Sequence, residues 1–286
     1  MTRHPEYQYL DLLRHIIDDG DPRVDRTGVG TRAIFGASMK FNISDGTIPI
    51  LTTKRIYWKT AIKELLWFLS GDTNIRSLLQ ANVKIWTDWP LATYRKASGE
   101  AVSQSEFEAR ILGDDAFAAK WGEVSVYGKY WRRWQGVDGR LHDQIATVIE
   151  QIRNNPSSRR ILFHGWNVGE LDNMALPPCH LLYQYGITSS GKLNSLMFQR
   201  SADTYLGLGW NLLSSCALQM MIAQQTDLEL GHFTWFGGDV HLYNNHFPQA
   251  HEQLTREPRS FPKLKLLRKP DSIDGYRIED FEVTGY

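Results

Sequence analysis

Cys179 is the side chain in this sequence that is best suited to covalent chemistry. It lies in MALPPCHLLYQY, with two prolines before it and His180 after it, and an intracellular cysteine with a nearby histidine is a candidate nucleophile. The reactive form is the thiolate, which requires nearby positive charge, and SSRR and QRSAD supply arginines on either side in the sequence. A free cysteine also packs well as a small apolar side chain, so the residues alone leave both interpretations open. Cys216, in the apolar run NLLSSCALQMMIAQQ, is expected in the core.

Four arginines and one serine have the chemistry of a phosphate site, because guanidinium groups bind phosphate oxygens in pairs. They are Arg26 in DRTGVGT, the neighbours Arg159 and Arg160, and the pair Arg200 and Ser201. The alternative is that these are unrelated surface side chains. The GVG of the first loop lacks the third glycine of a dinucleotide-binding fingerprint, which disfavours a Rossmann interpretation.

Glu64 is the candidate acid or base, since it lies among the apolar residues of ELLWFLS. Burial there would raise its pKa and suit it to moving protons near neutrality; the alternative is that it occupies the wet face of its helix. His241 and His246 are five residues apart, a poor zinc spacing. The sequence therefore predicts no metal.

Composition favours one compact domain without general affinity for polyanions. The 286 residues include 32 basic and 32 acidic side chains, and 42% of them are hydrophobic. Zero formal charge predicts no nucleic-acid or membrane partner, so an anionic ligand must meet a local arginine cluster. The charged N-terminal segment has no apolar core of a signal peptide, and two isolated cysteines predict reduced thiols. We expect a cytoplasmic protein.

The hydrophobic periodicity predicts interleaved helices and strands without regular alternation, which is typical of the α+β class. Helices are expected from Tyr7 to a stop at Gly20 and over 56–75, 142–156 and 211–225. Strands are expected over 31–43, from 157 onward, and over 180–187, 193–199, 232–237, 263–267 and 277–282. The polar, weakly periodic stretch 92–123 is interpreted as a surface excursion.

Taken together, these segments closely resemble the thymidylate synthases and their nucleotide-hydroxymethylase relatives. The matching segments, in order along nearly the whole chain, are DRTGVGT, LTTKR, ELLWFLSGDTNI, IWTDW, VYGKYWRRW, SSRRILFHGWNVGEL, MALPPCH, QRSADTYLGLGWN, GGDVHLY and YRIEDFE. The resemblance implies a three-layer α+β fold with a bent mixed sheet, and a homodimer formed sheet to sheet. It implies a single catalytic domain over 1–286, with a surface insertion near 92–123.

The resemblance also assigns roles in nucleotide binding. Cys179 would attack C6 of dUMP, a step of covalent catalysis, and Asn211 would pair with O4 and N3 of the base, which favours uracil over cytosine. Asp203 would support the ring, and His241 with Tyr243 would bind the 3′-hydroxyl. The 5′-phosphate would be held by Arg26, Arg200 and Ser201, with Arg159 and Arg160 donated by the partner subunit.

The implied one-carbon donor is the cosubstrate 5,10-methylenetetrahydrofolate. Glu64 would organise the water network that moves protons, Tyr127 would assist removal of the C5 proton, and His180 would orient its neighbours rather than act as the base. The residues expected around the folate are Lys54, Trp86, Trp89, Asp203, Gly207 and Trp210.

Three departures from the usual synthase pattern bear on the product. The chain stops at Tyr286 without the usual apolar tail, Gly209 and Trp210 replace a Pro-Phe pair, and EVSVYG replaces a segment that usually has proline before VYG. A lid that excludes water decides whether hydride or water reaches the exocyclic methylene. We therefore expect hydroxymethylation of dUMP, with release of tetrahydrofolate. The retained Trp86 counts toward the alternative, reductive methylation to dTMP with dihydrofolate, and a third possibility is an inactive nucleotide-binding homologue.

Overall fold

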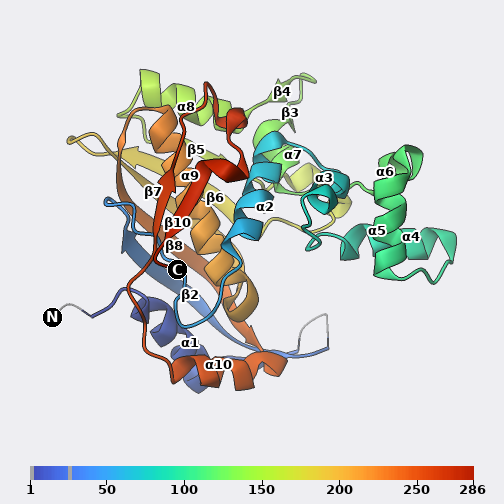
Figure 1. Ribbon diagram of the computed structural model, residues 1–286, viewed down its shortest axis with the longest axis horizontal. Coiled ribbons are helices and arrows are strands. Elements are labelled where there is room, and N and C mark those ends of the chain that lie inside the picture. Colours follow the sequence, from blue (N-terminus) through green and yellow to red (C-terminus); the bar gives the residue numbers. More distant parts are fainter. Residues whose placement is uncertain (1–2, 25–27) are drawn as a thin grey trace. The chain divides into compact units, whose positions relative to one another are not determined.

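The structure is a computed structural model that describes residues 3–24 and 28–286 (Figure 1). The chain forms two compact units. Unit 1 comprises Met1–Ala61, Val148–Phe163 and Cys179–Tyr286, and unit 2 comprises Ile62–Thr147 and His164–Pro178. Helices and strands are interleaved, and the main sheet is mixed, so the α+β prediction is confirmed.

A six-stranded sheet organises unit 1, in the order β1-β2-β8-β7-β6-β5 (Figure 1). Strands β7 and β8 run parallel, whereas the pairs β1–β2, β2–β8 and β6–β7 are antiparallel. Buried and half-exposed residues alternate along β7, as expected when one sheet face is covered. The bounds are β1 Asp21–Arg23, β2 Thr31–Asn42, β5 Leu162–His164, β6 His180–Ile187, β7 Lys192–Asp203 and β8 Glu229–Tyr243.

Two helices of unit 1 pack on this sheet. Helix α1, Tyr7–Asp19, contacts β2 and β8, and helix α9, Gly209–Gln225, contacts β7 and β8. The helical segment Thr204–Gln225 is long and apolar enough to span a membrane, but 78% of an apolar 18-residue stretch within it is buried inside the protein, as in a core helix. Helices α8, Gln144–Asn154, and α10, Phe247–Leu254, complete the larger helical segments.

The C-terminal hairpin of unit 1 pairs β9, Lys263–Leu266, with β10, Phe281–Thr284. The strand predicted over 277–282 therefore begins later than expected. Residues Ile278–Asp280 form a 3₁₀ turn instead. Local hydrogen bonds stabilise this turn, because the Asp280 carboxylate accepts the Arg277 N–H and pairs with the Arg268 guanidinium.

Unit 2 is mainly helical. Its elements are α2 Trp58–Ser70 from Ile62 onward, α3 Ile75–Gln80, α4 Asp88–Ser98, α5 Gln104–Gly113, α6 Asp115–Trp121, α7 Tyr127–Arg132, β3 Trp134–Gln135 and β4 Leu141–His142. The helix predicted over 56–75 ends at Ser70 because Gly71 adopts φ +68°, a left-handed conformation suited to glycine.

The weakly periodic stretch 92–123 folds as helices α4, α5 and α6, shown in green in Figure 1. Their ends are set by capping side chains rather than by hydrophobic periodicity. Ser103 and Glu106 form a capping box at α5, and Asp114 caps α6. Aromatic rings join the three helices, with Tyr94 against Phe107 and Phe117.

Candidate active site

The sheet of unit 1 brings the candidate nucleophile to the candidate phosphate site. Cys179 directly precedes β6, and its carbonyl accepts the backbone N–H of Arg200 on β7 at 2.9 Å. Because β6 is antiparallel to β7, and β7 is parallel to β8, the start of β6 meets the ends of the other two strands. The register accordingly pairs Asp203 with His241. Residues far apart in sequence therefore share one end of the sheet.

The two cysteines lie in different surroundings. Cys179 is half-buried at this strand end, whereas Cys216 is fully buried on α9. Burial raises the pKa of the Cys216 thiol well above its ordinary value, since the thiolate is poorly solvated there. The prediction that Cys216 is a core residue is confirmed.

His180 and Asn211 meet beside Cys179. The Asn211 Nδ2 lies 2.9 Å from the His180 Nε2. Burial lowers the pKa of His180 to about 4, because the charged imidazolium would be desolvated. A neutral His180 can accept the Asn211 amide hydrogen. Asn211 itself is half-buried.

Asp203 stabilises the turn that follows β7. Its carboxylate accepts the backbone N–H groups of Tyr205 and Leu206, both at 3.0 Å, and thereby caps the π-helical turn Thr204–Leu208. Lys54 reaches the same turn, where its ammonium donates to the Tyr205 carbonyl and lies 3.6 Å from the Tyr205 ring centre. Burial lowers the pKa of Lys54 to about 8.

Asp239 is a further candidate site residue, which the sequence motifs did not single out. One of its oxygens lies 2.9 Å from His241 Nδ1, and the other accepts from Arg23 at the end of β1. Arg26 itself lies outside the described residues. The sequence does contain one indication of this contact, the two-residue spacing of Asp239 and His241 in GDVHLY, because residues two apart on a strand point to the same face.

The paired arginines differ from the other candidates in exposure. The residues Arg159 and Arg160 both lie on the surface before β5. Within the part of the chain that the structure describes, no hydrogen bond or ion pair of either guanidinium is found. Their backbones are held by Ser158 and Gln184, which fixes where the side chains start.

In unit 2, the structure resolves the alternatives for Glu64 in favour of burial. Glu64 is 7% exposed, and one carboxylate oxygen accepts the indole N–H of Trp86 at 2.8 Å. The Trp86 ring in turn packs on Trp89, with ring centres 4.9 Å apart, and near Tyr127. One cluster of mainly aromatic side chains thus contains two residues predicted for proton transfer, Glu64 and Tyr127, and two predicted for folate binding, Trp86 and Trp89.

Gly209 corrects one step of the sequence reasoning. We expected glycine there to replace a rigid proline and loosen the folate side of the site. A Cβ built on Gly209 would lie 2.8 Å from Leu51 Cδ1 and 3.1 Å from Ile56 Cδ1. The backbone is therefore packed directly against the LTTKR loop. The following Trp210 is half-buried, and Gly207 lies close to the Asn211 side chain.

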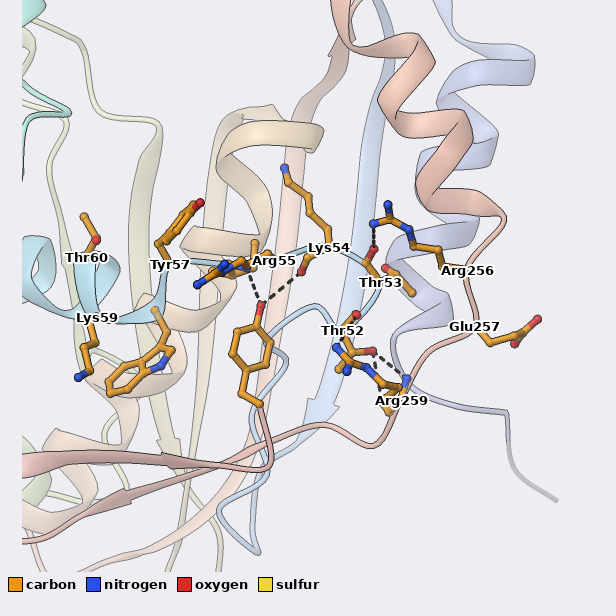
Figure 2. Close-up of a pocket in the computed structure, with 13 residues that line it drawn as sticks. Thr52, Thr53, Lys54, Arg55, Tyr57, Lys59, Thr60, Arg256, Glu257 and Arg259 are labelled. Carbon is orange, nitrogen blue, oxygen red and sulfur yellow. Dashed lines mark hydrogen bonds between the residues drawn. The ribbon is translucent and has the colours of Figure 1, made fainter.

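An open cavity of about 790 Å³ adjoins Lys54 (Figure 2). Its lining includes one acidic side chain, Glu257, and a larger set of basic ones, which are Lys54, Arg55, Lys59, Arg256 and Arg259. Tyr286 also lines the cavity, and its hydroxyl accepts the backbone N–H of Ile56 at 2.5 Å. The cavity is therefore suited to an anionic ligand.

Comparison with known proteins identifies the family. The family described as thymidylate synthase matches residues 7–286. A thymidylate synthase of Rhodopseudomonas palustris is 62% identical over 285 residues, covering 99% of this chain and 96% of the relative. Those of Rhizobium rhizogenes and Zymomonas mobilis are each 60% identical, covering 100% and 98% of this chain and 96% and 95% of the relatives.

These comparisons overturn the prediction of a hydroxymethylase. Relatives 54–63% identical over nearly the full chain carry the name thymidylate synthase, which supports dTMP formation. The packing of Gly209 removes part of the physical argument for a loosened site, because that backbone has no free space beside it. The chain therefore belongs to the thymidylate synthase family of enzymes.

Proposed function

We propose that the enzyme converts dUMP to dTMP by reductive methylation, with dihydrofolate as the second product. The observation that carries this proposal is the meeting of Cys179, Arg200 and Asn211 at one end of the sheet in a chain whose relatives are named thymidylate synthase. The proposed nucleophile, phosphate ligand and base-reading amide thus all belong to unit 1. This is the set that covalent activation of a nucleotide requires.

Nucleotide binding is assigned to the strand ends of unit 1. The thiolate of Cys179 adds to C6 of uracil, which makes C5 nucleophilic. Arg200 and Ser201 bind the 5′-phosphate together with Arg26, as charge-assisted hydrogen bonds favour. His241 and Tyr243 bind the 3′-hydroxyl, and Asp239 orients the His241 ring through Nδ1.

When bound, 5,10-methylenetetrahydrofolate supplies the one-carbon unit and the hydride. The folate carries glutamate carboxylates, and the basic cavity beside Lys54 has complementary charge. We assign its ring system to the aromatic residues Trp86, Trp89 and Trp210, with Asp203 and Gly207 at the capped turn. Exclusion of water by these groups favours hydride over water as the final reactant.

Proton transfer is assigned to the polar groups of unit 2. The Glu64 carboxylate, which accepts the Trp86 indole N–H, organises the water that exchanges protons with O4 and the folate. Tyr127 assists loss of the C5 proton. His180 orients Asn211 and is not the base, since its pKa of about 4 reflects a ring held neutral by burial.

We further propose that the two units act as one catalytic domain in a cytoplasmic homodimer, with 92–123 as a surface insertion. The three-layer arrangement and bent sheet implied by the resemblance belong to this proposal. Two aromatic side chains support the proposed dimer. Phe198 on β7 and Phe236 on β8 pair with each other on the sheet face opposite α9, and neither side chain is buried. Sheet-to-sheet association would cover them and bring Arg159 and Arg160 to the partner's phosphate site.

The reaction is tested by incubating the enzyme with dUMP and methylenetetrahydrofolate, following dihydrofolate absorbance and nucleotide mass. We expect a gain of CH₂ with stoichiometric dihydrofolate. A gain of CH₂O without dihydrofolate would exclude the proposal. Cys179→Ala should abolish turnover without unfolding the protein, and continued turnover by this variant would exclude the covalent mechanism.

The dimer is tested by mixing two inactive variants. Cys179→Ala supplies intact arginines, and the double variant Arg159→Ala/Arg160→Ala supplies an intact nucleophile. After subunit exchange at equal amounts, half of the dimers are mixed and each has one complete site, which predicts about a quarter of wild-type activity. Absence of activity in a verified mixed dimer would show that these arginines do not act across the interface.

A further inference from the structure

Trp86, whose indole N–H binds Glu64, lies in a four-residue turn between helices α3 and α4. The turn spans residues 84–87 and is closed by a backbone hydrogen bond from the Thr87 N–H to the Lys84 carbonyl at 3.2 Å. The Glu64 carboxylate on α2 accepts from the Trp86 indole at 2.8 Å. The direction of that indole N–H therefore depends on how the turn is held.

A buried carboxylate of the surface insertion 92–123 holds both ends of this turn. Glu108 on α5 accepts from the Lys84 ammonium at 2.5 Å and from the Thr87 hydroxyl at 3.1 Å. The Gln104 side chain, one helical turn earlier on α5, donates to Glu108 at 2.8 Å. Glu108 is 4% exposed and Thr87 is 1% exposed, so water competes little for the bond between them.

The Glu108 carboxylate is ionised in this setting. Desolvation by burial raises the pKa of Glu108, but the hydrogen bonds from Lys84, Gln104 and Thr87 together outweigh it, and the net pKa lies below the ordinary value. An ionised carboxylate can only accept, so each of its three partners acts as a donor. Hydrogen bonds to a charged acceptor are roughly twice as strong as neutral ones. Glu108 therefore joins α5 to both ends of the turn.

The helices of the insertion are in turn held by the segment that leads into α3. Arg76 pairs with Asp115 and donates to the Leu112 carbonyl at 3.0 Å. The Asn74 side chain donates to the Ala118 carbonyl at 2.7 Å. The helix that carries Glu108 thus has a defined position within unit 2.

We propose that Glu108 is a positioning residue for the reaction, through which the insertion sets the direction of the Trp86 indole. By holding Lys84 and Thr87, it keeps the indole N–H directed at Glu64. The inference rests on the proposed function, in which Glu64 organises proton transfer. When the turn is released, Glu64 loses a donor that fixes its carboxylate, and proton transfer becomes slower.

Two variants at Thr87 separate the hydrogen bond from packing. Thr87→Val keeps the shape of the side chain and removes its hydroxyl, whereas Thr87→Ser keeps the hydroxyl and removes a methyl group. Packing alone predicts that serine is the more harmful change, since it leaves a small cavity. The hydrogen bond predicts the opposite order. Glu108 remains paired in Thr87→Val, because Lys84 and Gln104 still bind it.

The first readout is the exchange of the Trp86 indole hydrogen with solvent in the enzyme without nucleotide or folate. It is measured by ¹⁵N NMR, with the resonance assigned by comparison with Trp86→Phe. Exchange requires that the bond to Glu64 opens, so its rate reports how well the turn is held. We expect Thr87→Val and Glu108→Gln to accelerate exchange about fivefold, the net effect of one hydrogen bond, and Thr87→Ser to keep the wild-type rate. An unchanged rate in Thr87→Val, or a larger effect of Thr87→Ser, would overturn the inference.

The second readout is the steady-state kinetics of dTMP formation. We expect Thr87→Val and Glu108→Gln to lower kcat about fivefold and to keep KM for dUMP within about twofold, because the proposed nucleotide ligands belong to unit 1. Glu64→Gln distinguishes the inference from the proposed function. If Glu64→Gln keeps full activity, the proposed role of Glu64 fails, and indole exchange alone decides whether Glu108 holds the turn. If Glu64→Gln loses activity while Thr87→Val and Glu108→Gln keep it, the positioning role of Glu108 is wrong.

Ile111→Val is the matched control for the stability of the insertion. Ile111 is fully buried on α5, one helical turn after Glu108, and the loss of a methyl group there should lower stability. Indole exchange and kcat should both keep their wild-type values. If Ile111→Val accelerates indole exchange as much as Thr87→Val does, at an equal loss of stability, the effect arises from a loosened α5 and the role of Glu108 is refuted.

Discussion

Replacing Glu6 tests whether a buried carboxylate holds the loop that carries Lys54. Glu6 is fully buried and directly precedes α1. It accepts the backbone N–H groups of Thr52 and Thr53, at 2.9–3.0 Å, and both threonine hydroxyls, at 2.6 and 2.7 Å. Lys54 is the next residue in the chain, so the anchor sets where its side chain begins.

The expected loss depends on which acceptors a variant retains. Glu6→Gln can keep an oxygen beside the two backbone N–H groups, and the Thr52 hydroxyl hydrogen can turn toward the Arg259 carbonyl, 3.3 Å away. We expect Glu6→Gln to lower the free energy of unfolding by about 1–2 kcal/mol, through loss of charge-assisted bonds. Glu6→Ala leaves two backbone donors without an acceptor, and its expected cost is about 4 kcal/mol.

Urea denaturation of Glu6→Gln, Glu6→Ala and a control measures these costs. The control for stability is Glu257→Gln, an exposed carboxylate that accepts from the Tyr7 hydroxyl, with an expected change within about 0.5 kcal/mol. Folate affinity should fall in Glu6→Gln, because the Lys54 loop is less well held. If Glu6→Ala costs less than about 1 kcal/mol, or if it equals the control, the reasoning about this anchor is wrong.

Three further predictions concern Lys54, Trp86 and Gly209. Because burial lowers the Lys54 pKa to about 8, the unfolded chain binds more protons than the folded one between pH 8 and 10.5, so the free energy of unfolding should rise with pH there. Lys54→Met should raise the free energy of unfolding at pH 7 by about 1 kcal/mol, after allowance for partial solvation, and should lose this advantage above pH 10.5. A difference between the two proteins that stays constant across that range would contradict the assignment. Trp86→Phe removes the 2.8 Å hydrogen bond to Glu64 and should lower the free energy of unfolding by about 1–3 kcal/mol. It should also lower kcat by a larger factor than it raises KM for dUMP. Equal factors for kcat and KM would argue against a role in proton transfer. Gly209→Ala should cost about 1–3 kcal/mol by overpacking against Leu51, measured by thermal unfolding, and a neutral effect would show that the loop yields.

The elements with strong hydrophobic periodicity could be predicted from the sequence. Helix α1 ends at Asp19 before Gly20, as expected, and β6 has the predicted bounds of 180–187. Strand β8 extends well beyond the predicted 232–237, because Gly237 and Gly238 interrupt the apolar alternation while the pairing to β2 continues. Tertiary pairing sets the length of such a strand, and a local pattern does not report it.

The site divides in the same way. Residue type and resemblance made Cys179, Asn211 and Glu64 candidates, but the contacts of each within its own unit could not be obtained from spacing. The bond of Glu64 to Trp86 joins helix α2 to the turn that precedes α4, and only folding shows that this carboxylate is buried. Asp239 could not be singled out in the same way, because its contact with Arg23 on β1 joins strands far apart in the sequence, and its contact with His241 on β8 depends on that strand being formed.

The interleaving of the two units also has a consequence for biosynthesis. Strand β2 lies in the sheet between β1 and β8, and Thr31 pairs with Tyr243, so the first long strand has no partner on that edge until most of the chain exists. At ribosomal rates of about 5–20 residues per second, that delay lasts roughly 10–40 s. During this time an unpaired strand edge is exposed to other nascent chains. The nascent enzyme is thus a predicted client of ribosome-associated chaperones, and its yield should depend more on their supply than on the stability of the finished fold.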